Sequence, residues 1–268
     1  MLRTILPVLA FCTVITVSAQ DMILGVSEGT SGGADHLTMI NKYRGLADIM
    51  ARSVGRPVDV VYVREFAALE AGMKAGRFDF VFARPSDYPA RGIESYGYTY
   101  LANAKPDGHC LLITRAGSPI KSIDQVRGKR IVLPQASAYM TKFCLAELRS
   151  RGIDPAREQV QYVREQGLVT MYLKNELADV GGIASYSGEA GKLESKGLTV
   201  VHTSVPQPYF PLIAARRVTQ QQRDAIRKAL GEVSLTSKGA PVLKSIGIDS
   251  FELTSERRLQ DLLVWLGA

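Results

Sequence analysis

The chain has 268 residues, of which 46% are hydrophobic and 22% charged, a composition that excludes intrinsic disorder, collagen and coiled coil. Its 33 basic and 26 acidic residues give a net charge of +7 without any run of five basic residues. Nothing therefore indicates a nucleic-acid surface, whereas a small anionic ligand is compatible with the mild basic excess.

The N-terminus predicts secretion. Arg3 precedes a mostly apolar run over residues 5–17, and the small residues Val17-Ser18-Ala19 follow. This pattern is typical of a cleavable signal peptide, here residues 1–19, so we expect a periplasmic protein. Leu9-Ala10-Phe11-Cys12 is a poor lipoprotein box, because Phe11 stands where a small residue is required.

The first part of the mature chain alternates predicted strands and helices. Apolar and β-branched runs predict strands, and apolar residues at helical spacing predict helices. In chain order these are a strand at 21–26, a helix at 36–53, a strand at 58–63, a helix at 66–75, and strands at 78–83, 98–103 and 109–114. A loop at 104–108 is expected between the last two.

A second series follows. Strands are predicted at 129–133, 160–163, 178–183 and 198–202, with helices at 137–151, 168–175 and 186–195. After Pro206-Gln207-Pro208 come a strand at 209–215 and helices at 219–235 and 255–266. Repeated strand–helix units imply parallel sheets with helices on both faces. The two series predict two α/β lobes, residues 20–103 plus 207–268 and residues 108–203, with hinge segments near 103–109 and 204–207.

The same pattern predicts where a ligand would bind. In open parallel sheets, ligands lie beyond the carboxyl ends of the strands. Six loops occupy such positions, namely 27–33, 64–66, 84–86, 134–139, 165–167 and 184–187. We expect them to face one another across one cleft between the lobes. Asp79 and Asp179, which stand beside apolar strands, are expected to be turn or cap residues.

Several segments resemble the phosphonate/phosphite-type (PhnD-like) periplasmic binding proteins. They are Lys42-Tyr43-Arg44-Gly45-Leu46-Ala47-Asp48 with Gly55-Arg56-Pro57-Val58, residues 67–79, Arg84-Pro85-Ser86-Asp87-Tyr88, and residues 118–130. Their order and spacing extend the resemblance over nearly all of the mature chain. The resemblance implies a type II periplasmic binding protein fold, with two α/β lobes that are each a mostly parallel sheet flanked by helices. It also implies capture of a small oxyanion, such as phosphate, phosphonate or phosphite, for an ABC transporter.

Eight residues are candidates for ligand binding: Ser137, Ala138, Tyr139, Arg84, Ser86, Gln166, Tyr186 and Cys110. A helix that begins near Ser137 would offer free N–H groups and a hydroxyl to an anion, although Ser137 could instead only cap that helix. The guanidinium of Arg84 suits a bidentate contact with an oxyanion, or else lies on the surface. Tyr139 and Tyr186 would supply hydroxyls or cleft walls, or only pack.

Cys110 and Cys144 are the two cysteines left after removal of the signal peptide. Three hypotheses are open: inert core thiols, a structural disulfide, or a free Cys110 thiol that binds a soft metalloid such as arsenite. The third would make the protein a metalloid or oxyanion sensor that feeds a histidine kinase, as in a metalloid-sensing branch that resembles this family.

A secreted serine hydrolase is the alternative from another class. Gly25-Val26-Ser27-Glu28-Gly29 matches the nucleophile-elbow pattern. It follows the first strand, however, and His36 lies too close to Ser27 for the usual order of a triad. We therefore predict that the protein is not an enzyme. No metal-ligand spacing occurs, so we expect no metal and no cofactor. The expected partners of the monomer are an ABC permease or a sensor kinase ectodomain, and no nucleic acid.

Overall fold

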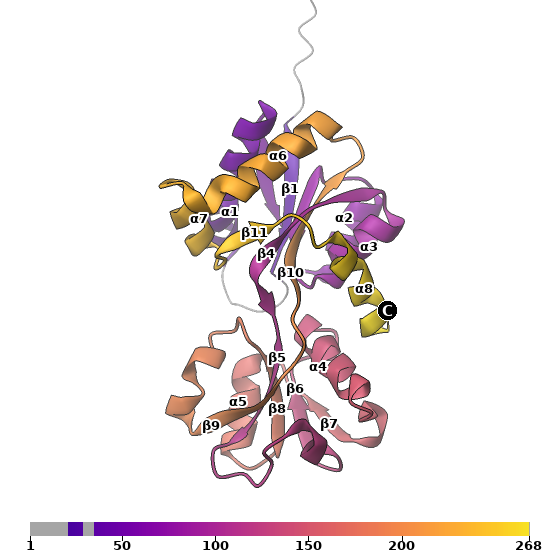
Figure 1. The fold of residues 1–268 in the computed structure, drawn as a ribbon, viewed down its shortest axis with the longest axis vertical. Helices are drawn as coiled ribbons and strands as arrows, with labels where there is room; N and C mark the ends of the chain where they lie inside the picture. Colours follow the sequence, from indigo (N-terminus) through magenta and orange to yellow (C-terminus); the bar gives the residue numbers. More distant parts are fainter. Residues whose placement is uncertain (1–20, 29–34, 268) are drawn as a thin grey trace, which may run out of the picture.

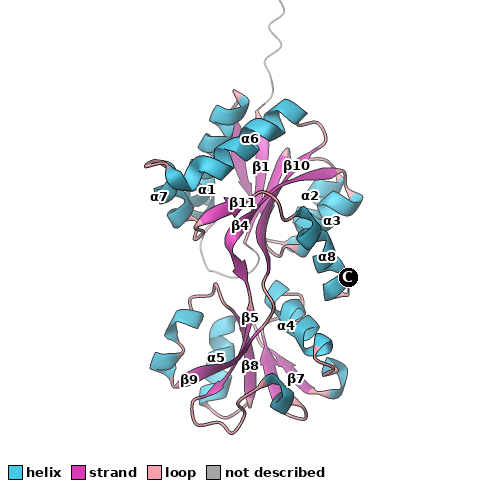
Figure 2. Ribbon diagram, in the orientation of Figure 1, coloured by secondary structure: helices cyan, strands magenta, loops and turns pink. Residues whose placement is uncertain are grey.

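The computed structural model describes residues 21–28 and 35–267. It has two lobes, each a sheet flanked by helices (Figures 1 and 2), so the predicted two-lobed α/β fold is confirmed. The predicted signal peptide lies outside the described residues. Among the helices that are described, none combines the length and apolar character needed to cross a membrane.

Lobe one contains a six-stranded sheet in the order β11-β4-β10-β3-β1-β2. Its strands are β1 (Met22–Ser27), β2 (Val58–Tyr62), β3 (Phe80–Ala83), β4 (Tyr98–Gly108), β10 (Gln207–Ala215) and β11 (Ser250–Glu252). β1 pairs in parallel with β2 and β3, whereas β10 is antiparallel to β3 and β4, and β11 is antiparallel to β4. Four of the six strands therefore run in one direction.

Six helices cover this sheet. They are α1 (His36–Val54), α2 (Phe66–Lys74), α3 (Asp87–Ser95), α6 (Gln220–Glu232), α7 (Gly239–Ser245) and α8 (Glu256–Leu266). α1, α6 and α7 pack into the core on one face, and α2 packs into a second cluster on the other (Figure 1). A 3₁₀ turn, Val233–Leu235, follows α6.

The sequence of α1 shows how such a helix is specified. Met39, Tyr43, Leu46 and Met50 recur at helical spacing and are all buried in the lobe-one core. Each such side chain contributes about 1.5–3 kcal/mol when it leaves water. At the N-terminus, the carboxylate of Asp35 accepts the backbone N–H of Thr38 at 2.9 Å, which satisfies one of the donors that a helix start leaves unpaired.

Lobe two contains a five-stranded sheet in the order β7-β6-β8-β5-β9. Its strands are β5 (Cys110–Arg115), β6 (Arg130–Leu133), β7 (Gln159–Tyr162), β8 (Val180–Ala184) and β9 (Leu198–Thr203). α4 (Tyr139–Ser150) and α5 (Gln166–Lys174) pack into separate clusters on its two faces. The 3₁₀ turns are Ile123–Val126, Pro155–Arg157, Ala190–Lys192 and Glu194–Lys196.

Several elements differ from the prediction. α3, α7 and β11 were not expected, and β4 continues through residues 104–108, where a loop was predicted. The helix predicted at 186–195 is replaced by two 3₁₀ turns, because Gly188 and Gly191 weaken a continuous helix there. α4 begins at Tyr139 with Ala138 as its N-cap, so Ser137 lies before the helix and does not cap it.

The chain crosses between the lobes twice, and the two crossings lie side by side. Gly108, the last residue of β4, is the register partner of Gln207, the first residue of β10. Directly beyond them, the backbone of Cys110 and the backbone and hydroxyl of Ser204 exchange two hydrogen bonds of 2.9 Å. The segments 103–109 and 204–207 include this doubled connection, and their role as a hinge stays a prediction.

A helix of lobe one also contacts lobe two. α8 packs on α4, where the ring of Trp265 meets that of Phe143 edge-on at 4.9 Å, and Arg149 donates to the carbonyl of Leu266 at 2.8 Å. The two crossing strands are thus supplemented by direct contacts between the lobes, which also include an ion pair of 3.0 Å between Lys142 on α4 and Asp87 on α3.

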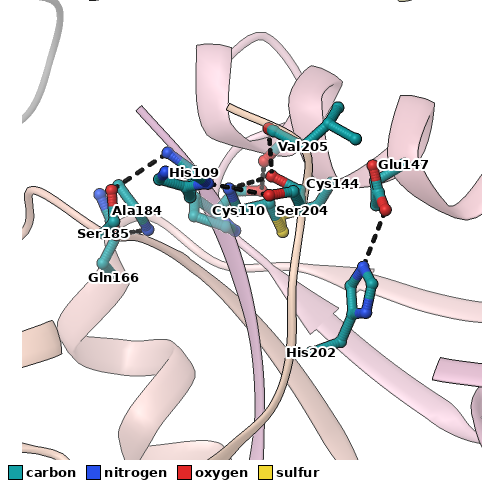
Figure 3. The surroundings of a disulfide bond; sticks show 12 residues. His109, Cys110, Cys144, Glu147, Gln166, Ala184, Ser185, His202, Ser204 and Val205 are labelled. Carbon is teal, nitrogen blue, oxygen red and sulfur yellow. Dashed lines mark hydrogen bonds and ion pairs between the residues drawn. A yellow bond between two sulfur atoms is a disulfide. The ribbon is translucent and has the colours of Figure 1, made fainter. Parts of the chain in front are cut away.

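Cys110 and Cys144 form a disulfide that ties the start of β5 to α4 (Figure 3). Both residues are fully buried, and their Cα atoms lie 5.3 Å apart. Gly182 on β8 leaves the space that the sulfur of Cys144 occupies, since a Cβ there would lie 2.8 Å from it. The hypothesis of a free Cys110 thiol that binds a metalloid is therefore wrong, as is that of two inert thiols. The distance between the two Cα atoms decides whether a disulfide forms, and the fold sets this distance. The spacing of the cysteines in the sequence does not predict it.

The disulfide predicts a measurable share of stability. Replacement of both residues (Cys110→Ala with Cys144→Ala) should lower the free energy of unfolding by about 2–4 kcal/mol, because the bond closes a long loop in the unfolded chain. Urea denaturation of the two proteins measures the difference. Thiol counting on denatured, unreduced protein that lacks the predicted signal peptide, and with it Cys12, should find none. Two reactive thiols there would contradict the assignment.

Candidate functional site

A cavity of about 430 Å³ lies between the two lobes. Lobe one contributes Glu28, Phe66, Arg84 and Pro85 to its wall. Lobe two contributes Pro134, Ala138, Tyr139, Met140, Arg164, Glu165, Gln166, Gly167, Tyr186, Ser187, Gly188, Glu189 and Lys192. Each of the six loops predicted at the carboxyl ends of strands supplies at least one of these residues. The cavity thus lies where parallel strands of both sheets end, as the topology of such sheets requires.

Arg84 forms the wall of the cavity on the side of lobe one. It follows β3 directly, and its backbone N–H donates to the carbonyl of Ser27 at 2.9 Å. Its guanidinium donates to the carboxylate of Glu28 at 2.7 Å and lies 5.1 Å from the ring centre of Tyr186. Burial tends to lower the pKa of Arg84, because it disfavours the charged form. The phenol oxygens of Tyr209 and Tyr186 and the carboxylate of Glu28 favour the charged form and outweigh the effect of burial, so the pKa of Arg84 is raised.

Glu28 is the partner that keeps this buried cation in place. Its Oε1 accepts the hydroxyl of Tyr43 at 2.5 Å and the ammonium of Lys42, and its Oε2 accepts from Arg84. Burial tends to raise the pKa of Glu28, but the nearby Arg84 and the hydrogen bonds from Lys42 and Tyr43 leave it lowered. Glu28 is therefore ionised at neutral pH.

Tyr186 brings lobe two into contact with this cluster. Its ring lies 4.4 Å from that of Tyr209 on β10, so an aromatic pair spans the junction of the lobes beside Arg84 (a geometry typical of stabilising ring contacts). Burial raises the pKa of Tyr186, which keeps its hydroxyl protonated and able to donate.

Two helices of lobe two begin at the cavity. Ala138 and Tyr139 stand at the start of α4, and Glu165 and Gln166 at the start of α5. Neither N-cap residue makes a side-chain cap hydrogen bond. The first N–H groups of a helix have no partner within it and carry the positive end of its dipole. The wall contributed by lobe two therefore favours negative charge.

Charged side chains also line the rim of the cavity. Arg164 and Lys192 line the cavity and form no ion pair with the residues described in the structure. Glu189 also lines it but is paired with Lys196 and accepts from Thr170 at 2.8 Å. The wall itself carries three cations and three carboxylates. Lys42 and Lys196, from outside the wall, pair with two of these carboxylates, Glu28 and Glu189.

The structure brings five of the predicted site residues to the cavity: Arg84, Ala138, Tyr139, Gln166 and Tyr186. Gln166 is partly engaged, since its side-chain oxygen accepts the backbone N–H of Ala184 at 2.7 Å. The hydroxyl of Tyr139 points to the carbonyl of Pro208 at 3.4 Å.

Three predicted site residues lie elsewhere. Ser86 is fully buried and donates to the carbonyl of Pro208 at 2.9 Å, so its hydroxyl is used within the fold. Ser137 is exposed and does not line the cavity, because α4 begins two residues later than predicted. Cys110 is buried in the disulfide.

Sequence reasoning missed Glu28, Arg164 and Lys192. Glu28 follows Ser27 in a loop already placed at the cleft, and Arg164 stands one residue before another such loop. Position relative to the strand ends could therefore have suggested both. Lys192 gave no such signal, because the segment that carries it was predicted to be helical.

The structure gives no support to a serine hydrolase. Ser27 is fully buried at the end of β1, so its hydroxyl is not presented to a substrate. His109 and His202 are engaged elsewhere, with the carbonyl of Ser204 and the carboxylate of Glu147 respectively.

Comparison with known families agrees with this geometry. The family model for periplasmic substrate-binding proteins of phosphonate ABC transporters matches residues 33–259. The chain belongs to this family. Proteins of this family are the periplasmic binding components of ABC transporters, which makes the chain a solute-binding protein of the type II fold. No curated protein sequence matches it.

Solved structures with the same fold include several binding proteins. XAC2383 from Xanthomonas citri, bound to ATP, shares 21% identity at a TM-score of 0.71, with 92% of this chain and 98% of that chain covered. A phosphonate-transporter binding protein of Pseudomonas aeruginosa, PA3383, shares 14% sequence identity at a TM-score of 0.62, with 90% of this chain and 86% of that chain covered. PhnD1 of Prochlorococcus marinus, in complex with methylphosphonate, shares 8% sequence identity at a TM-score of 0.67, with 91% of this chain and 96% of that chain covered. At these identities the similarity establishes the fold of this chain.

The pairing of Glu28 predicts a response to acid. A carboxylate whose pKa is lowered from 4.5 adds stability above that pH, and the addition is lost as the pH falls through the lower pKa of the folded protein. The difference in unfolding free energy between wild type and Glu28→Gln should therefore be constant near neutral pH and shrink below about pH 4.5.

Urea denaturation of both proteins over a series of pH values measures this difference. If it stayed the same from neutrality to about pH 3, the carboxylate would not be held ionised by its partners.

Proposed function

We propose that this protein captures a small oxyanion of the phosphonate, phosphate or phosphite class in the cleft between its lobes. It works in the periplasm, which it reaches by means of the cleavable signal peptide, and delivers the ligand to an ABC permease. The observation that carries the proposal is the guanidinium of Arg84 at the cavity wall, opposite the starts of α4 and α5.

Arg84 is suited to an anionic ligand because its hydrogen-bonding capacity is not exhausted. Its Nε is buried without a partner among the described residues, and a buried donor that lacks an acceptor is costly. An oxyanion in the cavity would supply that acceptor once the side chains that cover this atom shift. A planar guanidinium can also meet two oxygens at once, which a lysine cannot.

Lobe two would complete the site. The uncapped starts of α4 and α5 offer backbone donors of the kind that bind phosphate and related anions, and Arg164 and Lys192 add charge at the rim. The volume of about 430 Å³ lies toward the small end of ligand sites. PhnD1 was solved in complex with methylphosphonate and XAC2383, in another structure, bound to chloride. Proteins with this fold thus bind small anions, which supports this ligand class.

Calorimetric titration tests the proposal. Protein freed of ligand by unfolding and refolding would be titrated with methylphosphonate, phosphate, phosphite and ATP. At a hundred times its dissociation constant, a bound ligand should stabilise the fold by about 2.7 kcal/mol. If neither calorimetry nor thermal unfolding detected any of these anions, the proposed ligand class would be wrong.

Substitution of Arg84 tests the residue that carries the proposal. Arg84→Lys should weaken binding of the anion by about tenfold or more, because a lysine keeps the charge but loses the bidentate geometry. Ser137→Ala is the matched control near the start of α4, and its affinity should stay within about twofold of wild type. Equal affinities for wild type and Arg84→Lys would exclude a bidentate contact.

A further inference from the structure

Glu28 is an acceptor placed where an anion is expected to bind. It lines the cavity, its side chain is only 9% exposed, and it bonds directly to the guanidinium proposed to hold the ligand. An anionic group that reaches Arg84 must therefore come close to a second negative charge. This arrangement places a condition on the chemistry of the ligand.

The condition follows from the hydrogen bonds of the carboxylate. A carboxylate accepts about four hydrogen bonds. The described residues supply two to Oε1, from Lys42 and Tyr43, and one to Oε2, from Arg84. With the donors of the described residues alone counted, Oε2 has one acceptor position left beside Arg84. A group with a proton can donate to it, whereas a group with only bare oxygens meets it as a like charge.

Oxyanions differ in this respect. A phosphoryl group loses its second proton with a pKa of about 6, so phosphonates and phosphate keep a P–OH in part of their population near neutral pH. A sulfonate of the same shape is fully ionised and has no proton to donate. The lowered pKa of Glu28 keeps the acceptor available under the same conditions.

We propose that Glu28 selects, through Oε2, for an oxyanion that carries a hydrogen-bond donor and discriminates against fully ionised oxyanions. The inference rests on the proposed function and specifies which members of its ligand class the cavity accepts. Arg84 supplies the attraction, and Glu28 supplies the selectivity. Lys42 and Tyr43 hold the carboxylate in position from the side of α1.

The test compares methylphosphonate with methanesulfonate, which has nearly the same shape. In wild type at about pH 6, methylphosphonate should bind at least about tenfold more tightly, as expected when one bond to a charged group is replaced by repulsion. In Glu28→Gln the two affinities should approach each other, because an amide can donate to a bare oxygen. Glu94→Gln removes one charge from an exposed position on α3 and should keep the preference of wild type.

Wild type alone provides a second measurement that needs no variant. Its affinity for methylphosphonate should fall as the pH rises through the second pKa of the ligand, since the dianion has lost its donor. An affinity that rises over this interval would overturn the inference, as would an unchanged preference in folded Glu28→Gln. If wild type bound neither of these anions at any pH, nor phosphate and phosphite in the titration described above, the proposed function itself would fail, which is a different result.

Discussion

The pairing of β4 with β10 is the constraint on which the rest of the structure depends. These strands are far apart in sequence, yet they pair from Tyr98 and Ala215 down to Gly108 and Gln207, and the chain leaves lobe one at the same edge where it returns. The two connections therefore run next to each other. The carbonyl of Pro208, in this segment, accepts from Ser86 of lobe one and Tyr139 of lobe two. The cavity lies next to this junction, where the ends of parallel strands from both sheets face each other.

The two lobes equip the cavity differently. Lobe one provides a buried, fixed charge: Arg84 is held by Glu28 and by aromatic rings, so its position is set before any ligand arrives. Lobe two provides helix starts and the exposed cations Arg164 and Lys192. A preformed half needs little reorganisation to meet an anion, and preorganisation of this kind lowers the cost of binding. In the proposed mechanism, lobe one determines which ligand is accepted and lobe two encloses it.

Much of this could be predicted from strand order and hydrophobic pattern. The alternation of elements gave the two lobes, and the carboxyl ends of the strands gave the six loops. Asp79 and Asp179 take the expected local roles, since each accepts a backbone N–H from the neighbouring strand, Ile23 at 2.8 Å and Arg130 at 3.0 Å. The predictions that failed concern features that depend on tertiary contacts. α3 contains Pro89 within a polar segment, and its helix is stabilised by packing that a local pattern does not report. The disulfide between Cys110 and Cys144 and the contact between Arg84 and Glu28 join segments that are distant in sequence, so a local pattern does not predict them.

The disulfide has a mechanical consequence for any motion between the lobes. Cys110 is the first residue of lobe two after the crossing, and Cys144 lies on the helix whose start faces the cavity. The bond therefore fixes α4 to the strand that leaves the hinge, so any rotation at the hinge carries the start of α4 with it. The neighbouring residue Phe143 contacts Trp265 of lobe one, and packed helices can slide past each other by small amounts in shear motions. Motion between the lobes would then be taken up at the hinge segments and at the surface between α4 and α8, while the anion-facing end of α4 keeps its place within lobe two.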